Sequence, residues 1–178
     1  MKEVEVKILE VKRKNIEETL ARLGAQKVFD GDIQTLFFDF VDGKIIKARD
    51  VLRLRKEEDK IELTYKKVRV DKAAKNAEEY SVEVSDLEMA EKILQNLGLG
   101  IIDDMLKHRV SYKLDTARFD LDRYLGKYDF IPEFLEIEAE NVEAIYKYAG
   151  LLGYKPKDCL PWSTKELIEN YSKKKKVA

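Results

Sequence analysis

Alternation of side-chain type with a period of two residues is the feature that most constrains the fold of this chain. It recurs in eight short segments, and successive side chains of a β-strand point to opposite faces. Each segment therefore predicts a strand with one apolar face and one face of almost only ionisable groups. The expected strands cover residues 3–8, 36–40, 51–55, 61–66, 80–84, 106–112, 118–122 and 134–138.

Three of these strands run into a segment with helical signals that ends at a Leu-Gly pair. The expected helices begin after polar residues that favour the N-cap position: Asn15, Ser85 or Asp86, and Asn141. They end before glycines that can take the left-handed conformation, namely Gly24, Gly98 and Gly153. A fourth helix is expected from Ser163, because Ser163 and Glu166 have the spacing of a capping box, and it runs into the lysines of residues 173–176.

This pattern predicts an α+β fold in which helices flank an antiparallel sheet or barrel. Many strands with helices inserted at intervals suit that class better than a parallel doubly wound sheet, and no Gly-rich phosphate loop argues otherwise. A length of 178 residues with 44% hydrophobic content is the usual size of one domain. We expect a single domain over residues 1–172 and a basic C-terminal tail over residues 173–178.

Composition excludes several kinds of function. The 34 basic and 35 acidic residues leave a net charge of −1, so no overall field attracts nucleic acid or an anionic membrane. The first residues carry alternating charges instead of an apolar signal segment, and no apolar run is long enough to span a membrane. We therefore expect a soluble, cytoplasmic protein without nucleic-acid or membrane partners. The chain has one cysteine and one histidine, which are too few ligands for a zinc site of the common Cys/His kind.

The charges on the polar faces are grouped by kind. Arg53 and Arg55 share one strand, and carboxylates come in pairs on others. An antiparallel sheet with one wet face gives the same alternation and is the simpler interpretation of any single strand. If the charged face instead lines an enclosed space, its groups persist only when paired with each other, a metal or a ligand. A polyphosphate with Mg²⁺ or Mn²⁺ fits such a mixture, because arginine and lysine bind phosphate oxygens and carboxylates bind hard cations.

Several motifs resemble those of CYTH proteins, the group that contains class IV adenylyl cyclases and thiamine triphosphatases. Residues 3–7 match the Glu-x-Glu-x-Lys signature. The later motifs follow in the family's order: Leu52-Arg53-Leu54-Arg55, Leu63-Thr64-Tyr65-Lys66, Lys107-x-Arg109, Leu121-Asp122 with Leu125-Gly126, and Phe134-Leu135-Glu136-Ile137-Glu138. The resemblance covers nearly the whole chain.

The resemblance implies an eight-stranded antiparallel β-barrel that binds a triphosphate lengthwise in a tunnel with divalent metal. The metal ligands it implies are Glu3, Glu5, Asp122, Glu136 and Glu138, with Asp120 assisting and Glu83 as a further acidic position. The phosphate ligands it implies are Lys7, Arg53, Arg55, Lys66, Lys107 and Arg109. The catalytic roles it implies fall to Glu5, Lys7, Arg55 and Glu138, with Mg²⁺ or Mn²⁺ as cofactor.

Three functions are consistent with these residues. The first is an adenylate cyclase that converts ATP to cyclic AMP and pyrophosphate, and the order of motifs favours it narrowly. The second is a phosphohydrolase of thiamine triphosphate or inorganic tripolyphosphate, and the third is a protein that binds nucleotide or polyphosphate without turnover. The expected partner is a small-molecule triphosphate, and a homodimer is the default assembly.

His108 and Cys159 invite chemical roles that the sequence does not support. By strand parity His108 faces away from Lys107 and Arg109, which favours a structural role. Cys159 has no nearby histidine and is expected to be a packed thiol.

Overall fold

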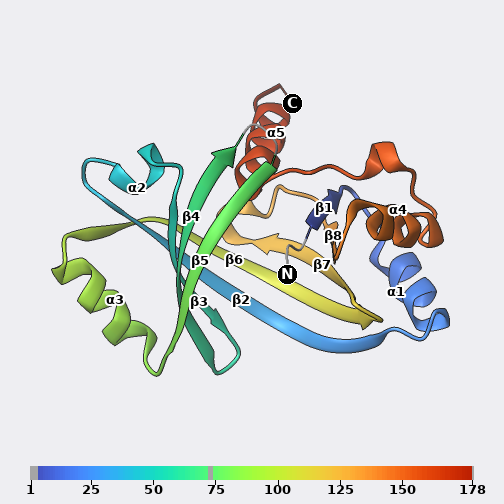
Figure 1. Cartoon of the computed structure of the whole chain (residues 1–178), viewed down its shortest axis with the longest axis horizontal. Coiled ribbons are helices and arrows are strands. Elements are labelled where there is room, and N and C mark those ends of the chain that lie inside the picture. The colour runs from blue at the N-terminus through green and yellow to red at the C-terminus, as the bar shows by residue number, and fades with distance from the viewer. Residues whose placement is uncertain (1–3, 72–73, 178) are drawn as a thin grey trace. The chain divides into compact units, whose positions relative to one another are not determined.

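The computed structural model of the chain describes residues 4–71 and 74–177. Its backbone divides into two compact units: unit 1 consists of Met1–Gly31 and Lys107–Ala178, and unit 2 of Asp32–Leu106. The strands β2 and β6 each contribute residues to both units (Figure 1). That the chain folds as a single domain stays a prediction.

The chain forms eight strands and five α-helices within the described residues. The strands are β1 (Val4–Ile8), β2 (Gln26–Phe40), β3 (Val51–Glu57), β4 (Lys60–Asp71), β5 (Ala74–Val84), β6 (Leu99–Leu114), β7 (Ala117–Leu125) and β8 (Phe134–Ala139). The helices are α1 (Arg13–Arg22), α2 (Lys44–Lys47), α3 (Leu87–Asn96), α4 (Val142–Leu151) and α5 (Thr164–Val177), with 3-10 turns η1 (Gly126–Tyr128) and η2 (Pro156–Asp158).

The strands pair into one antiparallel sheet in the order β1-β8-β7-β6-β2-β3-β4-β5. The predicted α+β class and the eight antiparallel strands are confirmed. β1 and β5 are the two ends of this order, so the pairing of the described strands does not close the sheet, and the predicted barrel is not confirmed. Alternation predicts strands and their faces, but it carries no information about whether the two end strands meet.

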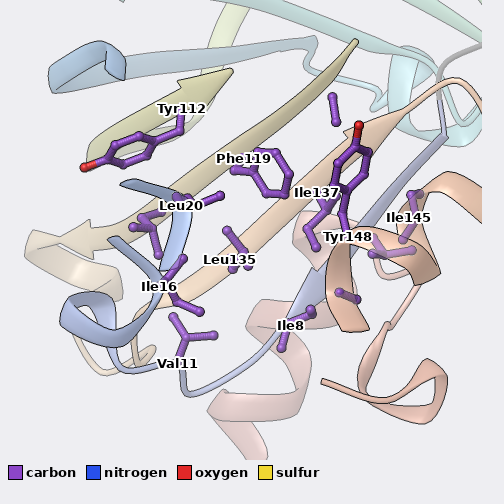
Figure 2. Packing of buried hydrophobic residues seen from close by; sticks show 14 of the residues in the cluster. Ile8, Val11, Ile16, Leu20, Tyr112, Phe119, Leu135, Ile137, Ile145 and Tyr148 are labelled. Atoms are coloured by element: carbon purple, nitrogen blue, oxygen red, sulfur yellow. The ribbon is translucent and has the colours of Figure 1, made fainter. Parts of the chain in front are cut away.

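The apolar side of the unit 1 strands packs against α1 and α4. Figure 2 shows Ile16 and Leu20 of α1, and Ile145 of α4, directed towards Leu135 and Ile137 of β8. All five side chains are buried, and Ile16 and Leu20 stand four residues apart, as one face of a helix requires. The core therefore fixes which side of β1, β8 and β7 carries the charged residues.

Three of the predicted helix starts are confirmed. The Oδ1 atom of Asn141 accepts a hydrogen bond from the backbone N–H of Ala144 at 2.8 Å, and Oδ1 of Asp86 accepts one from Met89 at 2.9 Å. At α5 the backbone N–H of Ser163 donates to Glu166 Oε2 at 2.8 Å, which is the reciprocal contact of a capping box.

The predicted cap at Asn15 is wrong, because the cap position is Lys12 and α1 begins three residues earlier than predicted, at Arg13. Contacts distant in sequence set this start: Arg13 Nε donates to Glu133 Oε1 at 2.8 Å, and the backbone N–H of Val11 donates to the Glu133 carbonyl at 3.1 Å. Local propensity cannot reveal such anchors.

This difference gives a matched pair of variants. Asn141→Ala removes a side-chain cap and is expected to lower the free energy of unfolding by about 1 kcal/mol, whereas Asn15→Ala, on an exposed helical position, is expected to change it by less than about 0.5 kcal/mol. Urea denaturation of both variants checks the prediction. Equal losses would contradict the cap assignment.

The core of unit 2 lies between its strands and α3. Leu36, Phe38 and Leu54 from the strands pack with Ala90 and Leu94 of α3. The short helix α2, which the sequence analysis did not predict, is held by Asp39, whose carboxylate accepts from the backbone N–H groups of Ile45 and Ile46 at 2.9 Å each.

β5 departs from the predicted division of faces. Val82 belongs to the apolar face but is 56% exposed. α3 contacts β3, and β5 is the end strand of the sheet order. On β5 the apolar alternation therefore predicts the strand correctly, but it does not predict that the apolar side chain of Val82 is buried.

The last helix, α5, continues through the lysines of residues 173–176 to Val177, as the predicted helix from Ser163 requires. That residues 173–178 form a tail separate from the domain stays a prediction. Leu167 and Tyr171 of α5 are buried, and the Tyr171 hydroxyl donates to Glu10 Oε1 at 2.8 Å. Within the described residues, no helix has both the length and the apolar content needed to cross a membrane.

Candidate functional site

Strand register brings charged side chains of unit 1 next to each other on the side opposite its core. Glu5 pairs with Glu138, and Lys7 pairs with Glu136, across β1 and β8. On the other side of β8, Arg118 of β7 pairs with Glu138. Paired residues of adjacent strands project from the same face, so these side chains form one continuous surface, here called the charged face.

Arg109 of β6 contacts three carboxylates on the charged face. Its Nη1 atom lies 2.5 Å from Asp120 Oδ2, and its Nη2 atom lies 2.5 Å from Asp122 Oδ2 and 2.6 Å from Glu136 Oε2. Its Nε atom donates to Asp122 Oδ1 at 2.6 Å. Burial by itself would lower the pKa of Arg109, but the carboxylates of Asp122, Glu136 and Asp120 raise it. Three carboxylates thus hold one guanidinium group.

Two lysines flank this arginine. Lys7 Nζ lies 2.7 Å from Glu136 Oε1 and 3.0 Å from Glu5 Oε1, and its side chain is only 2% exposed. Lys107 Nζ lies 2.6 Å from Asp122 Oδ2. Burial lowers the pKa of Lys107 against the opposing effect of Asp122.

Glu136 contacts Lys7 as well as Arg109. Burial would raise the pKa of Glu136, but Lys107, Lys7 and Arg109 hold it well below its usual range. Glu136 therefore stays ionised, and its negative charge is shared among these cations.

The two ends of the charged face differ in exposure. At one end the side chains of Glu5 and Arg118 are 58% and 41% exposed. At the other end Tyr124 and Phe134 are buried and stack with their ring centroids 5.9 Å apart. Burial raises the pKa of Tyr124, and this side chain also forms a hydrogen bond with Thr164 of α5. The charged face is therefore accessible at the Glu5 end and filled at the Tyr124 end.

Unit 2 carries its own basic set on β3 and β4. Lys66 pairs in register with Glu79, and its Nζ atom lies 2.8 Å from Glu79 Oε2. Arg53 Nη2 lies 3.7 Å from Glu79 Oε1. The Nε atom of Arg55 is buried and has no hydrogen-bond partner within the part of the chain that the structure describes. A buried donor without a partner is costly, and an anionic oxygen would satisfy it.

Glu79 is a residue of this set that the sequence analysis missed. The expected strand began at residue 80, whereas β5 begins at Ala74. An earlier strand start would have placed Glu79 on the same face as Ser81 and Glu83, opposite Lys66.

The further acidic position that the resemblance implied, Glu83, lies on β5 in register with Glu62 of β4, and it is exposed.

The carboxylates predicted to bind metal fall into two groups. Asp122 and Glu136 accept close contacts from Arg109 and the lysines, whereas Glu5 and Glu138 lie opposite each other at the exposed end. Glu3 lies outside the described residues. Among residues 4–71 and 74–177, no three acidic, histidine or cysteine side chains are grouped so that they could hold a metal ion.

Two carboxylates are nevertheless enough for one kind of metal site. Like charges directly opposite each other on neighbouring strands destabilise a sheet, and a divalent cation removes that repulsion. Mg²⁺ keeps several waters and commonly uses one or two carboxylates together with substrate phosphates. Glu5 and Glu138 fit such a donor set, and their metal role stays a prediction.

His108 and Cys159 lie away from the charged face. His108 Nε2 is 3.2 Å from Asp30 Oδ1, on the side of β6 that its parity predicts. Cys159 is buried in the unit 1 core, where burial raises the pKa of its thiol. The expectation that Cys159 is a packed thiol is confirmed.

Comparison with known proteins identifies the family. The sequence matches the model of the CYTH domain over residues 1–145. The chain belongs to the CYTH domain family. It is 28% identical over 138 residues to a Methanocaldococcus jannaschii protein named "Putative adenylate cyclase MJ0240". The match covers 78% of this chain and 77% of that protein.

Solved structures agree with this assignment. The PH1012 protein of Pyrococcus horikoshii has a TM-score of 0.74 and 28% identity, with coverage of 93% of this chain and 99% of that one. A Hippeastrum protein named "Putative adenylyl cyclase HpAC1", which is described as revealing a dominant triphosphatase activity, has a TM-score of 0.64 and 14% identity, with coverage of 85% of this chain and 88% of that one. The latter likeness shows the CYTH fold alone.

The CYTH signature residues that the structure describes lie on β1. The signature residues Glu5 and Lys7 stand on one face of this strand, where Lys7 contacts Glu136 of β8. The first and last of the motifs that carry the resemblance therefore meet at one pair of strands.

Proposed function

We propose that this CYTH chain is a divalent-metal-dependent enzyme acting on a triphosphate, with the adenylate cyclase reaction as the first candidate. The observation that carries this proposal is the charged face of unit 1, where buried lysine and arginine side chains adjoin a pair of facing carboxylates, Glu5 and Glu138, at an exposed end. A surface that only faces water does not need cations buried as deeply as Lys7 and Arg109.

The side chains on this face support binding of phosphate oxygens. The Lys7 ammonium has three donors, of which the contacts with Glu5 and Glu136 use two. Arg55 in unit 2 offers a planar group that can bind two oxygens at once, and its buried Nε lacks a partner among the described residues. Within unit 1 we assign Lys7, Lys107 and Arg109 to binding of phosphate oxygens, and within unit 2, taken by itself, Arg53, Arg55 and Lys66.

Glu5 and Glu138 are the residues that would hold Mg²⁺ or Mn²⁺. When bound there, the ion would supply positive charge that stabilises the reacting phosphoryl group. Lys7, next to Glu5, would hold a phosphate oxygen at the same place. Fixed charges of this kind serve both a cyclase and a hydrolase, because the two differ in whether a ribose hydroxyl or a water attacks.

The name of the Methanocaldococcus relative supports the cyclase as the first candidate. A triphosphatase is the second, and one observation favours it. The aromatic side chains at the filled end of the charged face, Tyr124 and Phe134, stack on each other instead of leaving a slot for a base. Recognition at this face therefore depends on phosphates rather than on a nucleobase.

Product analysis tests the proposal directly. Purified protein is given ATP, thiamine triphosphate and tripolyphosphate separately, with Mg²⁺ and then Mn²⁺. Cyclic AMP with pyrophosphate from ATP supports the cyclase, and release of orthophosphate supports the triphosphatase. Binding without any product would leave only the non-catalytic binding function.

A thermal melt gives a second test without assuming a product. Tripolyphosphate with Mg²⁺ at about 100 times its dissociation constant should add about 2.7 kcal/mol and raise the melting temperature by about 5–11 °C. Monophosphate and sulfate at equal ionic strength should give no comparable shift, because only a chain of three phosphates is long enough to reach both the basic side chains and the metal held by the carboxylates. Equal shifts for all three anions would indicate general screening and contradict the proposed site.

A further inference from the structure

We propose that Asp122 is a positioning residue that orients Lys107 and Arg109 for phosphate binding, and that it does not bind the metal. This inference rests on the proposed function and assigns a different role from the metal role that the resemblance implied. It follows from the contacts of both carboxylate oxygens, from burial and from the local balance of charge.

Both oxygens of Asp122 are committed to cations of the protein. Oδ1 accepts from Arg109 Nε at 2.6 Å, and Oδ2 accepts from Arg109 Nη2 at 2.5 Å and from Lys107 Nζ at 2.6 Å. An ionised carboxylate has about four lone-pair sites, so three of them are used. A divalent ion on the remaining site would lie close to two positive groups and be repelled by both.

Burial separates Asp122 from the exposed carboxylates. Its side chain is 0% exposed, whereas that of Glu5 is 58% exposed. Mg²⁺ loses its water reluctantly and favours sites where several waters remain. The exposed end of the charged face offers that access, and the position of Asp122 does not.

Charge balance gives an independent argument. Four cations, Lys7, Lys107, Arg109 and Arg118, contact four carboxylates, Glu5, Asp120, Asp122 and Glu136. The four positive and four negative charges cancel without a metal. Adding a divalent ion at Asp122 would leave the buried part of this cluster with an excess of positive charge.

The function of Asp122 follows from these contacts. A lysine carries its charge on a flexible stem and can point in many directions. Asp122 holds the ammonium group of Lys107 beside the guanidinium group of Arg109, so that both cations are in place before a triphosphate arrives. Such preorganisation increases affinity because little ordering remains to be done on binding.

Asp122→Asn separates the positioning role from the metal role. Affinity for tripolyphosphate is measured by calorimetry in EDTA, and the Mg²⁺ concentration for half-maximal turnover is measured separately. We expect the metal-free affinity to fall at least about tenfold and the Mg²⁺ requirement to stay within about twofold of wild type. Unchanged metal-free affinity with a raised Mg²⁺ requirement would overturn the inference. Glu138→Gln serves as the contrast, because it should show that second pattern.

A charge-balanced variant guards against loss of folding. Lys107→Met combined with Asp122→Asn removes one charge of each sign from the cluster. Because Asp122 also holds Arg109, Asp122→Asn should still lower the metal-free affinity for tripolyphosphate in the Lys107→Met background, but by a smaller factor than in wild type. A double variant that needs far more Mg²⁺ than Lys107→Met would overturn the inference.

Failure of the proposed function has a different signature. Wild-type protein that binds no tripolyphosphate, with or without Mg²⁺, would overturn the proposed function together with this inference. Wild-type binding combined with a shifted Mg²⁺ requirement in Asp122→Asn would overturn the inference alone.

Discussion

Glu138→Gln is expected to lower turnover by about 100- to 1000-fold while the fold stays intact. Glu138 lies opposite Glu5 in the β1–β8 register, and the amide that replaces it is a far weaker ligand for a hard cation. Metal stabilisation of a phosphoryl transition state contributes several kcal/mol, and each 1.4 kcal/mol corresponds to a tenfold change in rate. Steady-state kinetics with saturating substrate and Mg²⁺ measure the loss.

Glu140→Gln is the matched control for this variant. Glu140 follows β8, is exposed, and accepts a hydrogen bond from the Thr116 hydroxyl at 2.9 Å. Its turnover should stay near that of wild type, and EDTA should abolish wild-type turnover until Mg²⁺ or Mn²⁺ is restored. Retention of most of the rate in Glu138→Gln would remove the carboxylate pair from the metal role.

Arg55→Lys is expected to weaken tripolyphosphate binding by about 10- to 100-fold although the charge is kept. Hydrogen bonds to charged groups contribute about 1.5–3 kcal/mol, and a lysine cannot reproduce the paired donors of a guanidinium group. The buried Nε of Arg55 has no partner in the described chain, so its contribution depends on a ligand. Calorimetry with metal-free tripolyphosphate measures the change.

Arg49→Lys provides the comparison for Arg55→Lys. Arg49 is exposed and lies just before β3, so this conservative exchange should leave affinity unchanged within about twofold. Equal affinities for the two variants and wild type would mean that Arg55 does not bind the triphosphate. The simpler interpretation of a sheet with one wet face would then hold for β3.

Much of the fold could be predicted because its signals are local. Phe119, Leu121 and Ile137 occupy alternate strand positions and are fully buried in the unit 1 core, as the pattern predicted. The caps at Asp86 and Asn141 also depend only on neighbouring residues. The helix start at Arg13 and the short helix α2 depend instead on Glu133 and Asp39, whose backbone partners the pattern does not reveal.

The candidate site could be predicted by residue type but not by pairing. Strand parity placed Lys7 and Glu136 on ionisable faces, whereas their contact depends on β1 pairing with β8, which no local pattern states. For the same reason, the separation of Asp122 from the exposed carboxylates was not visible in the sequence. Closure of the sheet depends on its two end strands, and alternation gives no information about it.

The pairing of the first strand with the last has a consequence for the order of folding. Val4 of β1 lies opposite Ala139 of β8, and the backbone of Lys7 also exchanges hydrogen bonds with Leu160 at 2.8 and 2.9 Å. Contacts between residues so far apart in sequence close late, because chain entropy opposes them until other structure has formed. During synthesis β1 must wait for residues 134–160 to leave the ribosome. A nascent chain thus carries Glu5 and Lys7 long before it can place them beside Glu136 and Glu138, so the charged face assembles only after β8 has been made.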